Sequence, residues 1–181
     1  MQYTRGQSAG KSRKEKTMTP QRPNVGGPNS RAFNLSEDWL VGFIDGEGCF
    51  HVGISKHNEV KFGYQILPEL TVVQHERDIS LLYTIRSFMK CGVIRRNHGD
   101  RFCWRVRNLN NLANVIVPFF EKHKLRSKKM IDFCKFAKVV RLMQEKKHLT
   151  EEGFKRILKI SQSMNRGGVR SVRIKRESIP E

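Results

Sequence analysis

The stretch "DWLVGFIDGEGCF", residues 38–50, places two acids among glycines at the end of an apolar, helix-like run. Ser36 is a good N-cap, so we expect a helix that begins there and ends between residues 46 and 48. The helix dipole disfavours anions at a C-terminal end. Asp45 and Glu47 therefore need a role other than simple capping of their own helix.

The charge of the chain indicates a polyanionic partner. Its 181 residues include 35 Lys and Arg against 17 Asp and Glu, a formal net charge of +18. This length suits one compact domain with tails. A solvated basic surface is the alternative, but the imbalance favours nucleic acid. The sequence has no apolar run long enough to span a bilayer and no visible signal peptide, so no membrane partner is expected.

The four cysteines indicate neither a metal site nor a disulfide framework. They lie at 49, 91, 103 and 134, without the paired spacing of a zinc site. The six histidines are scattered as well. A reducing compartment fits this pattern best.

Composition divides the chain into three segments. Residues 1–33 hold seven Lys and Arg and one acid, a net charge of +6, and are expected to be disordered. They are either a basic arm or an organelle transit sequence, and the second reading would place the protein in a chloroplast or mitochondrion. Residues 34–165 form the expected domain and residues 166–181 a basic tail. The 148 residues after the arm still carry +12, so the arm does not account for the charge.

Two hairpins follow the first helix. Apolar and polar residues alternate over 49–74 and again over 93–107, with turn-forming residues within each stretch. Pro68 indicates a sheet edge or a bulge. Residues 75–90, 108–123, 127–147 and 149–165 have helical patterns. The predicted fold class is α+β, in the order helix, hairpin, helix, hairpin and further helices.

The polar faces of the two hairpins form a predicted DNA-binding surface. The side chains are His51, Ser55, His57, Lys61, Gln65 and Thr71 on the first hairpin, and Arg95, Asn97, Arg101, Arg105 and Arg107 on the second. A two-stranded ribbon fits the major groove, and these residue types match base edges and phosphates. Glu69 is the one acid along these strands. The absence of base-stacking aromatics argues against single-stranded RNA as the main ligand.

The segment "LVGFIDGEG", residues 40–48, resembles the motif that names the LAGLIDADG homing endonucleases. The resemblance covers roughly residues 34–165 and is of the single-motif type. It implies an αββαββα unit with extra C-terminal helices and a curved, antiparallel, four-stranded DNA-binding sheet. The order of elements predicted from the residues agrees with this fold.

A single motif implies a homodimer. Gly42 and Gly46 are four residues apart and share a helix face without side chains, which allows a second helix to approach closely. Gly42 in mid-helix costs ~1 kcal/mol relative to Ala, so a packing reason is expected. The predicted dimer contacts are Trp39, Val41, Gly42 and Asp45.

The resemblance also assigns the acids. It implies that Glu47, with Gly46 beside it, binds Mg²⁺ or Mn²⁺, and such a site needs only one or two carboxylates. Asp45 is expected to be structural, accepting hydrogen bonds from backbone amides or hydroxyls near the helix end.

The remaining catalytic groups are assigned by the same resemblance. Gln74 matches a glutamine that positions water or metal. A basic group is expected from "KLRSKK", residues 124–129, with Arg126 and Lys128 as rivals and Arg77 a further candidate.

The family implies a DNA endonuclease that promotes intron homing. It would make a metal-dependent staggered break with 3′ overhangs, across the minor groove of a long, partly palindromic site. The alternative is a binding protein of the same fold, either an RNA-binding intron maturase or a regulator that does not cleave. Glu47 and Gln74 favour the enzyme, because a binding protein has no need of a carboxylate beside phosphates.

Overall fold

The computed structural model describes residues 35–60 and 62–165; the predicted arm and basic tail and Lys61 lie outside these ranges. The first half of the domain consists of α1 (Glu37–Glu47), β1 (Gly48–Lys56), β2 (Tyr64–His75), η1 (Glu76–Asp78) and α2 (Ile79–Met89). The second half consists of β3 (Val93–Arg96), β4 (Arg101–Val106), α3 (Leu109–Asn111), η2 (Leu112–Ile116), α4 (Val117–Lys122), α5 (Lys129–Gln144), η3 (Lys147–Leu149) and α6 (Glu151–Gln162). The predicted order of helices and hairpins is confirmed.

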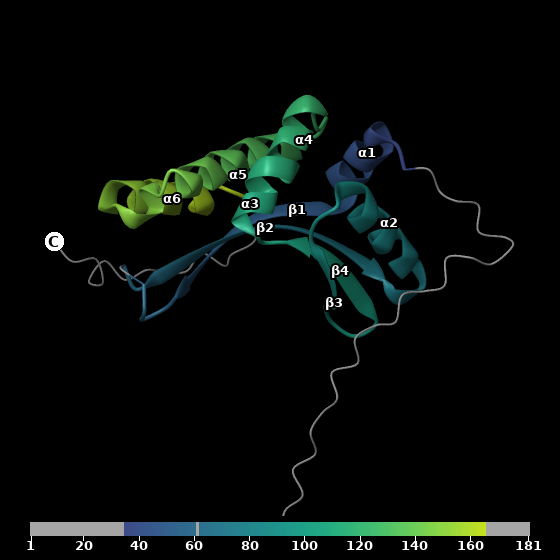
Figure 1. Ribbon diagram of the computed structural model, residues 1–181, viewed down its shortest axis with the longest axis horizontal. Coiled ribbons are helices and arrows are strands. Elements are labelled where there is room, and N and C mark those ends of the chain that lie inside the picture. The colour runs from purple at the N-terminus through teal and green to yellow at the C-terminus, as the bar shows by residue number, and fades with distance from the viewer. Residues whose placement is uncertain (1–34, 61, 166–181) are drawn as a thin grey trace, which may run out of the picture. The chain divides into compact units, whose positions relative to one another are not determined.

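The four strands form one antiparallel sheet in the order β1-β2-β4-β3. The sheet is curved, and α1 and α3–α6 lie on one side of it (Figure 1). The side chains that point toward the helices are apolar and buried, as in β1, where Phe50, Val52 and Ile54 alternate with more exposed residues. The predicted division into an apolar face and a polar face is therefore confirmed.

Pro68 lies where β2 has only one neighbouring strand. The β1–β2 register is unbroken and pairs Pro68 with Val52, whereas the pairing of β2 with β4 begins at Leu70. A proline is tolerated there because its missing N–H removes no bond to a second strand. Of the two predictions for Pro68, the sheet edge is confirmed and the bulge is not found.

Aromatic rings join the sheet to the helices. Phe50 of β1 packs against Phe120, Phe133 and Phe136, with ring centroids 5.3–5.5 Å apart. On the same inner face of the sheet, the buried indole N–H of Trp104 donates to the carbonyl of Cys91 at 2.9 Å, which joins β4 to the end of α2. These contacts fix α4 and α5 over the strands.

The helix ends agree with the sequence except in one segment. Ser36 caps α1 by accepting a bond from the N–H of Trp39, and Thr150 caps α6. The helix expected over 108–123 is instead divided by a π-helical turn, in which the N–H of Val117 bonds to Leu112. Pro118 follows directly and has no N–H to donate, so the regular ladder is interrupted at this point. Among the described helices, none combines the length and apolar character needed to cross a membrane.

Candidate functional site

The end of α1 is bonded to the start of α5 through Asp45. Its Oδ2 accepts from the backbone N–H of Arg126 at 2.7 Å and of Ser127 at 2.8 Å, and its Oδ1 accepts from the Ser127 hydroxyl at 2.5 Å. Burial alone would raise the pKa of Asp45, but these hydrogen bonds and the charge of Lys129 outweigh it, and the pKa is lowered. These contacts match the structural role expected for Asp45.

Lys129 of α5 makes a second contact to α1, in which α5 supplies the side chain and α1 the backbone. Its Nζ donates to the carbonyl of Ile44 at 3.0 Å and to that of Gly46 at 3.1 Å. Both carbonyls belong to the last turn of α1, where helices leave acceptors without partners. Burial lowers the pKa of Lys129, although the charges of Asp45, Cys49 and Glu47 oppose this shift.

Glu47, the last residue of α1, is exposed. No hydrogen bond or ion pair of its carboxylate is found among the described residues, although its charge acts on Lys129. Gly48 follows at once as the first residue of β1, and a Cβ there would lie 2.7 Å from both Ile44 Cγ2 and the Ile44 carbonyl oxygen. Glycine therefore allows the chain to pass directly from helix to strand, with Glu47 at the corner.

Gln74 lies near this corner but on the helix side of the sheet. The β1–β2 register pairs Gly48 with Val72, so Gln74 is two residues further along β2, beside the end of α1. It is paired with Phe102 of β4 and shares the inner face with that ring. The outer face carries its neighbour His75, whose Nε2 lies 2.8 Å from Asp100 Oδ2.

The two basic residues predicted for the site lie close to Lys129 in sequence but make different contacts. Arg126 gives its backbone N–H to Asp45, and its side chain is exposed. Lys128 is exposed immediately before α5. The amine that reaches the end of α1 is that of Lys129, which was not among the residues predicted for the site. The sequence shows two adjacent lysines at 128 and 129, but it does not indicate which of them faces α1.

The outer face of the sheet holds the predicted DNA-binding side chains. Register places Thr71 opposite Arg105, His75 opposite Arg101, and Ser55 opposite Gln65. Arg95 pairs with Cys103 of β4, and the N–H of Asn97 bonds to the carbonyl of Arg101.

The remaining predicted side chains extend this face. His51 is exposed on β1, and Arg107 is exposed just after β4. His57 is only partly exposed, and its Nδ1 is buried without a partner among the described residues. The strands thus bring the predicted set together on one surface, apart from Lys61, which is not described.

The outward side of α1 contains the two glycines. A Cβ added at Gly42 or at Gly46 would meet no atom within 4 Å. Trp39 and Phe43 stack beside them, with ring centroids 4.9 Å apart.

One of the predicted dimer contacts needs correction. Val41 is 7% exposed and belongs to the core of its own chain, so little of its side chain is available to a second copy. Asp45 bonds to the segment before α5, and its place at a dimer contact stays a prediction.

Comparison with known families identifies the class. Residues 40–140 match the family model described as LAGLIDADG endonuclease. This match covers more than half of the chain, and the chain belongs to that family. The motif at 40–48 and all four strands lie within the matched residues.

Relatives and solved structures give the same result. The chain is 34% identical over 148 residues, 81% of its length, to a probable intron-encoded endonuclease 2 of Neurospora crassa. It is 31% identical over 118 residues, 64% of its length, to an uncharacterized protein in ND4 intron 1 of Podospora anserina.

The structure is similar to the crystal structure of a homing endonuclease, I-TnaI, with a TM-score of 0.71 and 51% identity. That match covers 74% of this chain and 90% of I-TnaI. A structure of I-SmaMI bound to uncleaveable DNA matches with TM-score 0.71 and 32% identity, over 74% of this chain and 46% of that one. The aligned part of the chain spans about a third or less of the length of these curated relatives and of a probable intron-encoded endonuclease 3 of Neurospora crassa.

Proposed function

We propose that the protein is a site-specific DNA endonuclease that cuts both strands of a long, partly palindromic duplex. The observation that carries this proposal is the position of Glu47. It is an exposed acid at the corner between α1 and β1, close enough to Lys129 for its charge to act on that amine, and without a bonded partner in the described part of the chain. A protein that only bound DNA would gain nothing from a carboxylate facing phosphates.

The site residues are compatible with a divalent metal ion, for which Mg²⁺ is our proposal and Mn²⁺ the alternative. Glu47 supplies a free carboxylate, and Gly46 supplies a carbonyl with a second lone pair beyond the bond to Lys129. No cluster of three His, Cys, Asp or Glu suited to a metal is found among the described residues. This favours Mg²⁺, which keeps several waters and takes few protein ligands. A bound metal would polarise the phosphoryl oxygen and lower the pKa of a coordinated water.

The protein groups around Glu47 have roles of their own in this proposal. Lys129 places a positive charge next to the reacting phosphate and stabilises the charge that develops there. Arg126 and Lys128 remain candidates for contacts to the same phosphate, and Gln74 for orienting water. Asp45 fixes α5, and therefore Lys129, relative to α1.

A second copy of the chain would complete the enzyme. The I-SmaMI chain matches this unit over 46% of its length, which supports a functional molecule built from two such units. The outward face of α1, with Gly42 and Gly46 open to approach, supplies the surface for a two-fold contact. Each unit would then cut one strand.

The biological role that fits is intron homing. Relatives are described as intron-encoded endonucleases in Neurospora crassa and Mycosarcoma maydis, and others lie within introns. Cleavage of the intronless allele, with 3′ overhangs, belongs to this proposal, as does an organellar location.

The test is cleavage of a plasmid library that carries a randomised insert, with Mg²⁺, followed by sequencing of the cut ends. The wild type should linearise a defined subset with 3′ overhangs. Glu47→Gln keeps the size of the side chain but removes its charge, so cleavage should fall by orders of magnitude. Binding of random duplex in a gel shift should persist, because affinity comes mostly from Lys and Arg.

Two controls separate chemistry from folding and assembly. Glu59→Gln makes the same chemical change in the β1–β2 turn and should cut like the wild type. A dimer with one Glu47→Gln subunit should nick rather than linearise its site. Double-strand cutting by the Glu47→Gln homodimer at the wild-type rate would refute the assignment of Glu47. A wild type that binds DNA and cuts no member of the library would favour the regulator instead.

A further inference from the structure

A single carboxylate lies within the basic face of the sheet. Glu69 of β2 is the one acid on the outward face of the strands that the structure describes, and its side chain is only 16% exposed. Register places it opposite His51, with Thr71 two residues further on the same face. An acid on a surface that meets phosphates weakens DNA binding unless it has a specific task.

The carboxylate of Glu69 faces the Nε atoms of two arginines. Its Oε2 accepts from Nε of Arg107 at 2.5 Å and lies 3.7 Å from Nε of Arg105. Its Oε1 accepts from the hydroxyl of Thr71 at 3.3 Å, which fixes the carboxylate on the strand. The Nε of Arg105 is itself buried and has no hydrogen bond within the described part of the chain, so the carboxylate of Glu69 is its electrostatic partner.

This arrangement leaves the terminal nitrogens of both guanidinium groups available to a ligand. No bond of their terminal nitrogens is found among the described residues. A purely structural Arg–carboxylate pair commonly uses two parallel bonds. Here the carboxylate bonds the Nε of Arg107 and lies near the Nε of Arg105, so each arginine keeps terminal N–H groups for a ligand. The side chains of Arg105 and Arg107 are 25% and 50% exposed, respectively.

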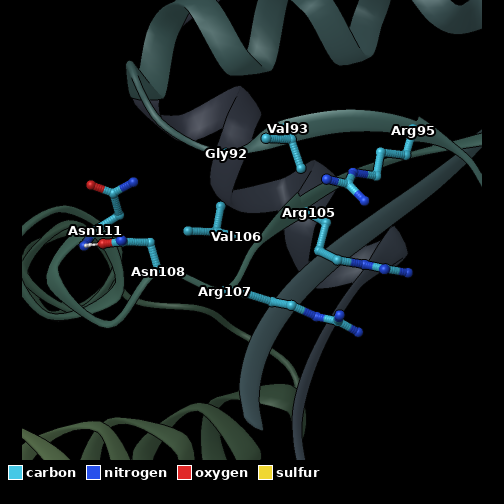
Figure 2. Close-up of a pocket in the computed structure, with 8 residues that line it drawn as sticks. All are labelled: Gly92, Val93, Arg95, Arg105, Val106, Arg107, Asn108 and Asn111. Atoms are coloured by element: carbon cyan, nitrogen blue, oxygen red, sulfur yellow. Dashed lines mark hydrogen bonds between the residues drawn. The ribbon is translucent and has the colours of Figure 1, made fainter. Parts of the chain in front are cut away.

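The two arginines have a spacing that suits duplex DNA. Arg105 is in β4 and Arg107 directly follows its last residue. Residues two apart on an extended chain are separated by roughly 6.6–6.8 Å, and two base-pair steps rise about 6.8 Å. Figure 2 shows Arg105 and Arg107 extending side by side in the same direction, at the edge of a hollow of about 270 Å³ that Arg95 also lines. Arginine reads guanine by bonds from its terminal N–H groups to O6 and N7.

We propose that Glu69 is a positioning residue that presents Arg105 and Arg107 to two guanines two base pairs apart in the target. This proposal rests on the site-specific DNA recognition proposed above. Without Glu69 the two like charges repel and each long side chain samples many rotamers. With Glu69 both are fixed before DNA arrives, so less entropy is lost on binding.

The test is selection of bound duplexes from a random-sequence 40-bp library, followed by sequencing. The wild type should enrich a motif with guanine at two positions two base pairs apart. Glu69→Gln should reduce the guanine preference at both by roughly tenfold, within the range of discrimination that a bidentate contact provides, and leave the rest of the motif intact. Its affinity for unselected duplex should rise, because a negative charge has been removed.

Two further variants keep the result interpretable. Arg107→Lys retains the positive charge but loses the planar guanidinium that can make two parallel hydrogen bonds. It should lose the guanine preference at one of the two positions. Glu59→Gln makes the same change in charge at the turn of the same hairpin and should retain the full motif. Thermal unfolding of each variant is measured alongside, and if Glu69→Gln is unfolded, Arg107→Lys decides the question.

The outcomes separate this inference from the proposed function. An unchanged motif in both Glu69→Gln and Arg107→Lys overturns the positioning role and leaves site-specific recognition standing. A uniform loss of affinity across all sequences also overturns it, because it identifies the arginines as phosphate contacts. A wild type that enriches no motif overturns both proposals.

Discussion

The Nζ of Lys129 lies 3.1 Å from the carbonyl oxygen of Gly46, and this bond joins the first residue of α5 to the last turn of α1. The contact is reciprocal, since Asp45 of α1 accepts the backbone N–H groups that precede α5. Each helix thus supplies the group that the end of the other lacks. The position of Glu47 is therefore fixed by a segment that lies more than 80 residues away in sequence.

Removal of the Asp45 carboxylate should destabilise the fold. Asp45→Ala eliminates three hydrogen bonds at the start of α5. Loss of a capping side chain costs about 0.5–2 kcal/mol, so we expect the free energy of unfolding to fall by about 1–2 kcal/mol. Urea denaturation measures the change. Glu145→Gln, at an exposed acid, should stay within about 0.5 kcal/mol of the wild type.

The pH dependence of that difference follows from the pKa of Asp45. Because the folded-state pKa is lowered, the carboxylate contributes stability above its ordinary value of about 3.9 and loses it as the pH falls through the folded value. The gap between wild type and Asp45→Ala should therefore be constant above about pH 5 and narrow below about pH 4. A gap that widens on acidification would show that the folded pKa is raised instead.

Gly42→Leu should abolish assembly without unfolding the subunit. A Cβ at Gly42 meets nothing within 4 Å in its own chain, and replacing a mid-helix glycine removes a penalty of ~1 kcal/mol. The thermal stability of the subunit should thus be retained, while close approach of a second helix is blocked. Sedimentation would then give a monomer where the wild type gives a dimer. A wild type that sediments as a monomer at micromolar concentration would contradict the dimer.

Much of the fold could be predicted because its signals are local. Alternation in 49–74 and 93–107 identified both hairpins, and Ser36 and Thr150 marked helix starts that the structure confirms. The outer face followed from the same alternation, since a strand of period two leaves little freedom in which side chains share a face. The pairing of β2 with β4 came from the expectation that the two hairpins share one sheet.

The features that the sequence patterns did not reveal depend on contacts between distant segments. Three basic residues occur within 126–129, and which one points at α1 depends on where α5 begins. That starting point is set by Asp45, some 80 positions earlier. The motif predicts Val41 at the dimer contact, but its side chain is buried in the core of its own chain. In the sequence, Glu69 differs from the other polar residues of these strands only in its charge, because a strand pattern does not show the partners of an isolated acid.

The roles of the two adjacent lysines can be separated by a matched pair of substitutions. Lys129→Met and Lys128→Met remove the same charge from neighbouring positions, so their effects on the overall attraction to DNA should be similar. Only Lys129 reaches the carbonyls at the end of α1, beside Glu47. If its ammonium stabilises the charge on the reacting phosphate, Lys129→Met should slow cleavage by about 10²–10³. The cleavage rate of Lys128→Met should fall much less than that of Lys129→Met.

The measurement is single-turnover cleavage of the selected site with saturating protein, beside urea unfolding of each variant. Saturation removes differences in affinity, and unfolding detects the loss of the bonds from Lys129 to α1. Lys129→Arg retains a charge in a bulkier group and should fall between wild type and Lys129→Met. The assignment fails if Lys129→Met is stable and cuts at the wild-type rate while Lys128→Met does not. In that event Lys128, one of the two basic residues that the sequence offers, would carry the role, and the bond from Lys129 to Gly46 would serve only to join the two helices.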